Sequence, residues 1–213
     1  MKAFFLISLL FILSCKNKEN EQLPTNNSKF TFTLIDGLGT VSMDFPDQTD
    51  TFFSWIQRSD CGKPCEHGDY RFQSKSNRIF KESGFAWSGE PEDTVNQLSI
   101  YHSRADSILS FDDSLIFQNV NFLMKSMLSD VTRANILSDT LIKIDDRNYY
   151  VFRVANFKKG GIRERKLIAF TTISGTILEF EYKLLTKNYD AITKDFFDTS
   201  LKNLYTVKLK DGS

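Results

Sequence analysis

Residues 177–184, ILEFEYKL, alternate apolar and charged side chains almost without a break. Successive side chains of an extended strand point to opposite faces of a sheet. One face of this segment therefore carries Leu178, Phe180, Tyr182 and Leu184, and the other carries Glu179, Glu181 and Lys183. The pattern predicts a strand of an antiparallel sheet that is covered on one face only.

Three further segments of strand-like composition precede this one, and short polar turns separate them. The segments are residues 140–144, 149–156 and 166–172, and the turns lie at residues 145–148, 158–161 and 174–175. Strands joined by such short turns pair with their neighbours in sequence, so this half of the chain predicts an antiparallel meander. The other half adds an alternating hairpin at residues 30–34 and 41–45 and shorter segments at residues 70–73, 77–81 and 97–102.

The apolar period lengthens to about 3.6 residues in two places, which predicts two amphipathic helices. The first spans residues 112–128, can be capped by Asp112 or Asp113, and has an apolar stripe of Leu115, Ile116, Val120, Leu123, Met124, Met127 and Leu128. The second begins at Asn188 or Asp190, and its stripe is Ile192, Phe196, Phe197, Ser200, Leu201 and Leu204. Each stripe is expected to pack on the sheet. The predicted fold class is therefore α+β, with an antiparallel sheet of about eight strands covered by two helices in one domain, residues 30–213.

The order of these elements resembles the PsbP-like fold family. The likeness is clearest in residues 149–152 (YYVF), 178–180 (LEF) and 196–201 (FFDTSL). It implies an α/β sandwich and a binding or accessory role, since members of that family act by docking to proteins. These positions are structural, so the resemblance assigns no catalytic residue.

The first 15 residues have the layout of an export signal. Lys2 is followed by an uncharged apolar run from Phe4 to Leu13 and then by Ser14 and Cys15. A helix of roughly 10 residues rises about 15 Å, half the thickness of a bilayer core, which favours a cleaved signal over a membrane span. Residues 12–15, ILSC, resemble the lipobox of bacterial lipoproteins. The resemblance implies that residues 1–14 are removed and that Cys15 is lipidated and anchors the protein to a membrane.

Residues 16–29, KNKENEQLPTNNSK, are almost free of apolar side chains and cannot bury enough surface to fold. With Cys15 they form a lipidated, flexible tether at residues 15–29, whose root-mean-square reach is roughly 20 Å. Lys16, rather than an aspartate, follows the lipidated cysteine. The retention signal familiar in enteric bacteria, an aspartate at this position, is therefore missing. The predicted location is the cell envelope at the outer membrane, on its periplasmic face or at the cell surface.

The charge balance excludes one class of partner. The chain has 27 Lys and Arg and 27 Asp and Glu, and loss of residues 1–14 removes one lysine and leaves a net charge of −1. A chain with this net charge has no overall positive electrostatic potential that would attract nucleic acid. It also contains no Gly-x-Ser-x-Gly, His-Glu-x-x-His, phosphate-binding or dinucleotide-binding motif. We predict a protein that is not an enzyme, uses no cofactor and has a protein partner.

The loop at residues 59–70, SDCGKPCEHGDY, contains the two cysteines that remain when Cys15 is lipidated. In an exported protein, such a pair most simply forms a disulfide. Gly62 and Pro64 favour a tight turn that brings the α-carbons of Cys61 and Cys65 within bonding range. The sequence therefore predicts a Cys61–Cys65 disulfide that fixes the shape of the loop.

A soft-metal site is the alternative. Cys61, Cys65, His67 and His102 supply a tetrahedral set of ligands for zinc or copper, although zinc motifs usually place their cysteines in two separate pairs. Redox catalysis fits this loop least well. Three residues separate the two cysteines, whereas the cysteines of redox motifs are usually separated by two residues.

Overall fold

The computed structural model describes residues 29–74, 95–104, 134–157, 161–188 and 191–212, with Gln118, Phe122 and Ser126 as isolated positions. Within these residues, ten strands form two sheets in which every pairing is antiparallel. The small sheet has the order β1 (Lys29–Thr33), β2 (Gly39–Asp44), β10 (Lys208–Asp211). The large sheet has the order β3 (Thr51–Gln57), β4 (His67–Gln73), β5 (Val95–Ser103), β9 (Thr176–Thr186), β8 (Arg163–Ile173), β7 (Arg147–Phe157), β6 (Ala134–Ile144).

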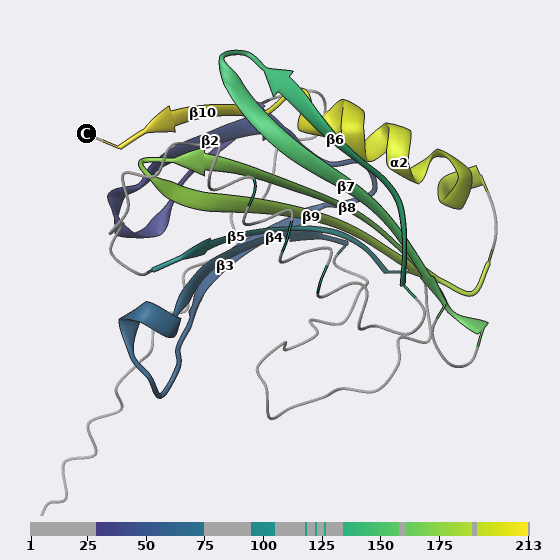
Figure 1. Ribbon diagram of the computed structural model, residues 1–213, viewed down its shortest axis with the longest axis horizontal. Helices are drawn as coiled ribbons and strands as arrows, with labels where there is room; N and C mark the ends of the chain where they lie inside the picture. The colour runs from purple at the N-terminus through teal and green to yellow at the C-terminus, as the bar shows by residue number, and fades with distance from the viewer. Residues whose placement is uncertain are drawn as a thin grey trace, which may run out of the picture.

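The small sheet and helix α2 (Ala191–Leu204) lie over the same face of the curved large sheet (Figure 1). The main hydrophobic core fills the space between these layers. Phe32 and Val41 enter it from the small sheet, Phe196 and Leu204 from α2, and Phe180 from the large sheet. We call this covered side of the large sheet the core face.

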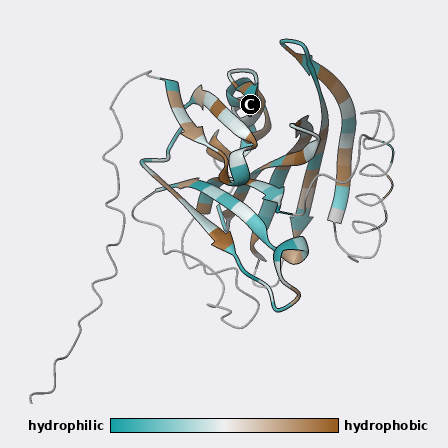
Figure 2. Ribbon diagram, turned by 90° about the vertical axis from the view of Figure 1, so that its left-hand side faces the viewer, coloured by the Kyte–Doolittle hydropathy of each residue, from teal (hydrophilic) through white to brown (hydrophobic). Residues whose placement is uncertain are grey.

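The prediction for residues 177–184 is confirmed on the core face. Leu178, Phe180 and Leu184 of β9 are fully buried there, and Tyr182 is nearly so. The charged positions between them point to the opposite side of the sheet, which we call the outer face. Figure 2 shows the alternation as bands of hydrophobic and hydrophilic colour along the strands.

Aromatic side chains join the small sheet to the large one. The ring centroid of Phe72 in β4 lies 5.6 Å from that of Phe30, 5.0 Å from Phe45 and 4.8 Å from Phe52. Edge-to-face and tilted ring pairs at these separations are favourable beyond the area they bury. Phe72 is fully buried and lies at the centre of this group.

The predicted meander is confirmed: β6, β7, β8 and β9 pair in sequence order. The hairpin of residues 30–34 and 41–45 is also confirmed, as β1 and β2. The turn between β8 and β9 has Ser174 at φ 47° and Gly175 at φ 74°. Positive φ at both central residues matches the right-handed twist of the flanking strands, and glycine adopts it without a steric cost.

The prediction of a single sheet of about eight strands is wrong. The described residues contain ten strands in two sheets. The sequence patterns missed β3, TFFSWIQ, because its apolar residues do not alternate, and β10, KLKD, because it has four residues and only one of them is apolar. Both strands are defined by their pairing partners, β4 for β3 and β2 for β10.

The second predicted helix is present as α2, with Phe196, Ser200 and Leu204 buried along one side and Ile192 partly exposed. Most of the first predicted helix, residues 112–128, lies outside the described residues. Gln118, Phe122 and Ser126 are helical and exposed, and none of them belongs to the predicted apolar stripe. The predicted strand at residues 77–81 and the predicted signal and tether up to residue 28 also lie outside the described residues.

The prediction that only one face of the sheet is covered is wrong. Five polar side chains of β4 and β5 are buried on the outer face: Asp69, Arg71, Gln73, Gln97 and Ser99. Arg71 donates from Nε to the Ser99 hydroxyl at 3.1 Å, and its guanidinium lies 5.1 Å from the Trp55 ring centroid. Further along the sheet, Phe152, Val154, Ile168 and Phe170 form a second buried apolar cluster on this face.

Candidate functional site

The loop between β3 and β4 carries the two cysteines, and the structure joins them. Cys61 and Cys65 form a disulfide with their α-carbons 5.9 Å apart. Gly62 has φ 79°, which favours glycine, and a short 3-10 helix, η2 (Lys63–Cys65), follows it. The amide of Gly62 donates to the Ser59 carbonyl at 3.0 Å, and the amide of Cys65 donates to the Gly62 carbonyl at 2.9 Å. Consecutive turns therefore place the cysteines within bonding range.

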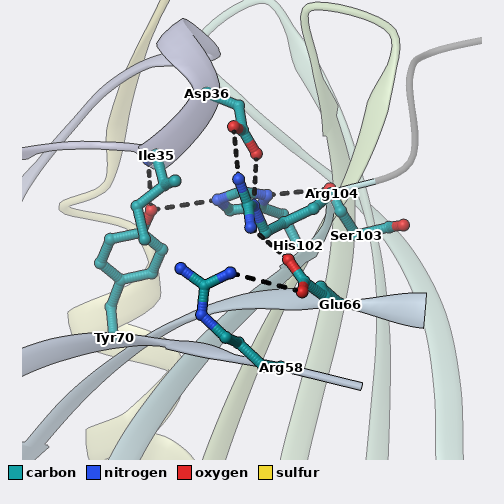
Figure 3. A network of polar contacts seen from close by, with 8 residues as sticks. All are labelled: Ile35, Asp36, Arg58, Glu66, Tyr70, His102, Ser103 and Arg104. Atoms are coloured by element: carbon teal, nitrogen blue, oxygen red, sulfur yellow. Dashed lines mark hydrogen bonds and ion pairs between the residues drawn. The ribbon is translucent and has the colours of Figure 1, made fainter. Parts of the chain in front are cut away.

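Glu66 fixes the base of this loop. Its side chain is buried, and its carboxylate accepts a hydrogen bond from the Arg104 guanidinium. The amide of Arg104 donates to the Glu66 carbonyl at 2.9 Å, and Arg58 lies 3.6 Å from the other carboxylate oxygen. Two arginines on opposite sides of Glu66 thus hold the end of the loop against the end of β5 (Figure 3).

Arg104 also binds a third segment of the chain. Its Nε and Nη2 donate to the two carboxylate oxygens of Asp36 at 2.8 and 3.0 Å. Asp36 belongs to the 3-10 helix η1 (Ile35–Gly37), between β1 and β2. The hydrogen bonds from Arg104 hold the pKa of Asp36 below its ordinary value despite partial burial, and the same bonds raise the pKa of Arg104. Bidentate arginine–carboxylate pairs of this kind have a defined geometry as well as an attractive charge.

A buried tyrosine–histidine pair lies beside these ion pairs. His102 Nδ1 lies 3.0 Å from the Ser103 carbonyl oxygen, which only accepts, so Nδ1 carries a proton. In the neutral ring, Nε2 then accepts from the Tyr70 hydroxyl at 3.0 Å, and the Tyr70 oxygen accepts from the Ile35 amide at 2.5 Å. The chain of bonds connects η1 to β4 and β5 (Figure 3).

Burial sets the protonation of both rings. It lowers the pKa of His102, so the ring is neutral at pH 7, and it raises the pKa of Tyr70 to about 12. Tyr70 and His102 are almost completely enclosed, with exposed fractions of 1% and 2%. The pair therefore holds η1 in place and does not face solvent.

Gly68 makes room for the His102 ring. The two residues are directly opposite each other in the β4–β5 pairing. A Cβ atom on residue 68 would lie 2.4 Å from His102 Nε2 and 2.7 Å from Cε1, closer than non-bonded atoms approach. Any other side chain at this position would displace the ring or the strand.

The structure does not bring the four predicted metal ligands together. The sulfurs of Cys61 and Cys65 are bonded to each other, and both ring nitrogens of His102 are used by Tyr70 and Ser103. His67 is exposed at the start of β4 and pairs with Ser103, not His102. Across the described parts of the chain, no three His, Cys, Asp or Glu side chains are grouped to hold a metal ion. Cys15 lies outside those parts.

The sequence patterns missed Asp36, Glu66, Tyr70 and Arg104. Asp36 and Arg104 are separated by 68 positions, and Tyr70 and His102 by 32. The pattern of residues within one segment does not indicate which distant residue each of them contacts. The nearby sequence signal is the break between the alternating segments at residues 30–34 and 41–45, and it gives no partner for Asp36.

A shallow cavity of about 220 Å³ lies between α2 and the start of β5. Leu98, Tyr182 and Phe196 form its apolar part, and Asp47 and Asp195 are its charged residues. Typical ligand pockets measure about 300–1,000 Å³, so this cavity admits only a small molecule.

No helix among the described residues is both long and apolar enough to cross a membrane. No protein-family model and no curated protein matches the chain. Among solved structures, the chain is similar to LpqN of Mycobacterium tuberculosis, which is described as involved in cell envelope biogenesis. The identity is 11%, the TM-score is 0.43, and the likeness covers 86% of this chain and 92% of LpqN. A likeness this low assigns neither a family nor a function to the chain.

Proposed function

We propose that this chain is a lipid-anchored protein of the cell envelope, held at the outer membrane by Cys15, and that it has no enzymatic activity. Its PsbP-like α+β domain binds a protein partner through the loop of residues 58–66, which we call the closed loop. One observation carries the proposal: residues 58–61 and 63–65 of the closed loop are exposed, yet a disulfide closes residues 61–65 and the ion pairs of Glu66 hold the end of the loop.

A rigid exposed loop suits protein recognition for an energetic reason. Ordering each flexible side chain at an interface costs about 0.5–1.5 kcal/mol, so a loop that is ordered before binding loses less free energy on association. In the closed loop, the disulfide limits the backbone within residues 61–65, and Arg104 connects Glu66 to Asp36 in the small-sheet layer. Lys63 and Pro64 are exposed inside the disulfide ring, and Asp60 is exposed directly before it.

Site-specific photocrosslinking in the native host tests the binding surface. A photoreactive residue replaces Asp60 in the closed loop, and a matched variant carries it at Lys202, which is exposed on α2. We expect one discrete adduct of defined mass from the Asp60 position and none of that mass from the Lys202 position. Equal labelling from both positions, or adducts of random mass, would refute the closed loop as the binding surface.

A separate experiment tests the anchor. The Cys15→Ala variant is expressed beside the wild type, and membrane and soluble fractions are compared. Two or three acyl chains give stable membrane attachment, whereas a single chain binds only marginally. We expect the wild type in the membrane fraction and the variant in the soluble fraction; an equal distribution would exclude lipidation at Cys15.

A further inference from the structure

Strand β6 is the last strand of the large sheet among the described residues (Figure 1), and we call its edge remote from β7 the open edge. It is 11 residues long, and no strand among the described residues pairs with its second edge. Leu141 in its middle has an exposed fraction of 55%, and Leu137, where the pairing with β7 is irregular, has 56%. A long exposed edge with apolar side chains is a template for pairing with another strand.

The hairpin that joins β6 to β7 determines which backbone groups face the open edge. Ile144 pairs with Arg147 across a two-residue loop, so these residues exchange backbone hydrogen bonds. Hydrogen-bonded and non-hydrogen-bonded positions then alternate along the strand. Ile142 and Thr140 therefore bond to β7, whereas the N–H and C=O groups of Lys143, Leu141 and Asp139 point towards the open edge.

The side chains of the same three residues share the outer face of the sheet. Leu141 lies opposite Tyr150, and Asp139 lies opposite Phe152, while Ile142 lies on the core face. Asp139, Leu141 and Lys143 are all exposed. Asp139 accepts a hydrogen bond from the Tyr150 hydroxyl at 2.8 Å, which holds its carboxylate on this face.

The sequence of this edge is complementary to itself. If two copies of β6 pair antiparallel about a two-fold axis at Leu141, each Leu141 faces the other. Each Asp139 then faces Lys143 of the second copy, so two opposite-charge pairs flank one apolar pair. All three pairs are hydrogen-bonded ones, because Asp139, Leu141 and Lys143 direct their backbone groups outwards.

The neighbouring registers lack this match. An axis at Asp139 places two carboxylates against each other, and an axis at Lys143 places two ammonium groups against each other. An axis at Thr140 or Ile142 puts a charged residue opposite Leu141. Like charges directly opposite each other destabilise a sheet, and opposite charges stabilise it.

We propose that two copies of this chain associate through β6, in the register centred on Leu141, and form a continuous antiparallel sheet across the dimer. The interface is isologous, as in most homodimers. Lipid anchoring on one membrane would raise the local concentration of the two copies and favour the contact.

Disulfide trapping of the full-length, membrane-bound protein tests the register. Hydrogen-bonded antiparallel pairs have their α-carbons about 5.5 Å apart, within the range of about 4.4–6.8 Å that a disulfide spans. The Leu141→Cys variant is oxidised in isolated membranes and resolved on a non-reducing gel, with Lys202→Cys as the matched exposed control. We expect a covalent homodimer from Leu141→Cys and at least about fivefold less from the control.

Charge reversal tests complementarity in the Leu141→Cys background. Lys143→Asp places two carboxylates opposite each other and should reduce trapping about fivefold. Adding Asp139→Lys restores both opposite-charge pairs and should restore trapping, a recovery that a folding defect would not give. Trapping no better than the control, no recovery in the double reversal, or a Leu141→Cys adduct with a different protein would each overturn the proposal.

Discussion

The two faces of the large sheet are built by the same strands and differ in how their side chains are stabilised. The core face is almost entirely apolar, and Phe72, Ile100 and Phe180 are fully enclosed there. On the outer face, β4 and β5 bury Asp69, Arg71 and Gln97. Glu179 and Glu181 of β9 are half-buried on the same face, and Glu181 pairs with Lys166. Burial on one face removes apolar surface from water, and burial on the other desolvates polar groups that need partners.

The comparison shows why alternation alone does not reveal exposure. A strand with polar residues at every second position is consistent with a solvated face, yet five of those residues in β4 and β5 are buried. Lys166 and Glu181 illustrate the compensation that this requires. Burial lowers the pKa of Lys166, but the Glu181 carboxylate at 2.7 Å, with Glu164 nearby, outweighs it and leaves the pKa raised.

The largest effect is expected at the centre of the core face. Phe72→Ala removes the ring that contacts Phe30, Phe45 and Phe52, and should lower the free energy of unfolding by about 3–5 kcal/mol. Chemical denaturation measures this loss. Phe157→Ala is the control, because Phe157 is 57% exposed, and should cost less than about 0.5 kcal/mol. Similar losses in the two variants would contradict the assigned core.

The polar end of the core face should be packed as tightly as its apolar centre. Gly68→Ala places a methyl group 2.4 Å from His102 Nε2 and should cost about 3 kcal/mol, at the upper end for an overpacked site. The same substitution in a His102→Ala background should cost much less, because the obstructing ring is absent. Equal costs in the two backgrounds would show that the His102 ring does not fill this space.

The closed loop lies beyond the ends of both faces, so its disulfide should contribute only a local restraint. Cys61→Ser with Cys65→Ser should lower the free energy of unfolding by about 2 kcal/mol, the chain-entropy value for so small a ring. Reduction of the wild-type protein should cause the same loss and should leave the double variant unchanged. A double variant that does not fold would mean that the loop supports the sheet more than its exposed position indicates.

The smallest effect is expected on the outer face and depends on pH. Burial, assisted by the Glu181 charge, raises the pKa of Glu179 from 4.5 to about 7. Between these values the folded state binds more protons than the unfolded state, so the free energy of unfolding falls as the pH rises. Glu179 is only half-buried, so solvent screens much of this effect. Glu179→Gln should therefore stabilise the protein by about 1 kcal/mol at pH 8 and change it little at pH 5.

Urea denaturation at the two pH values measures this difference. Asp198→Asn, at an exposed carboxylate of α2, is the matched control and should change stability little at either pH. A Glu179→Gln variant with the same stability change at pH 5 and pH 8 would show that the carboxyl is not desolvated on this face.

The sequence by itself determined the meander of β6 to β9, the hairpin of β1 and β2, and helix α2. In each of these, the signal is a local period of apolar side chains or a turn between neighbours, and the partners are adjacent in sequence. Short-range steric preferences and side-chain direction are sufficient to specify such elements.

Only the tertiary structure decided that there are two sheets, that polar residues are buried on the outer face, and that Asp36, Glu66 and Arg104 meet beneath the closed loop. Asp36 and Arg104 are 68 positions apart along the chain, and β2 of the small sheet pairs with β10 near the other end of the sequence. A salt bridge or a strand pairing between distant segments depends on how the whole chain folds. The residues next to each partner in the sequence do not indicate that contact. This is the physical reason that the sequence predicted the loop and its cysteines but not the ion pairs that hold the loop in place.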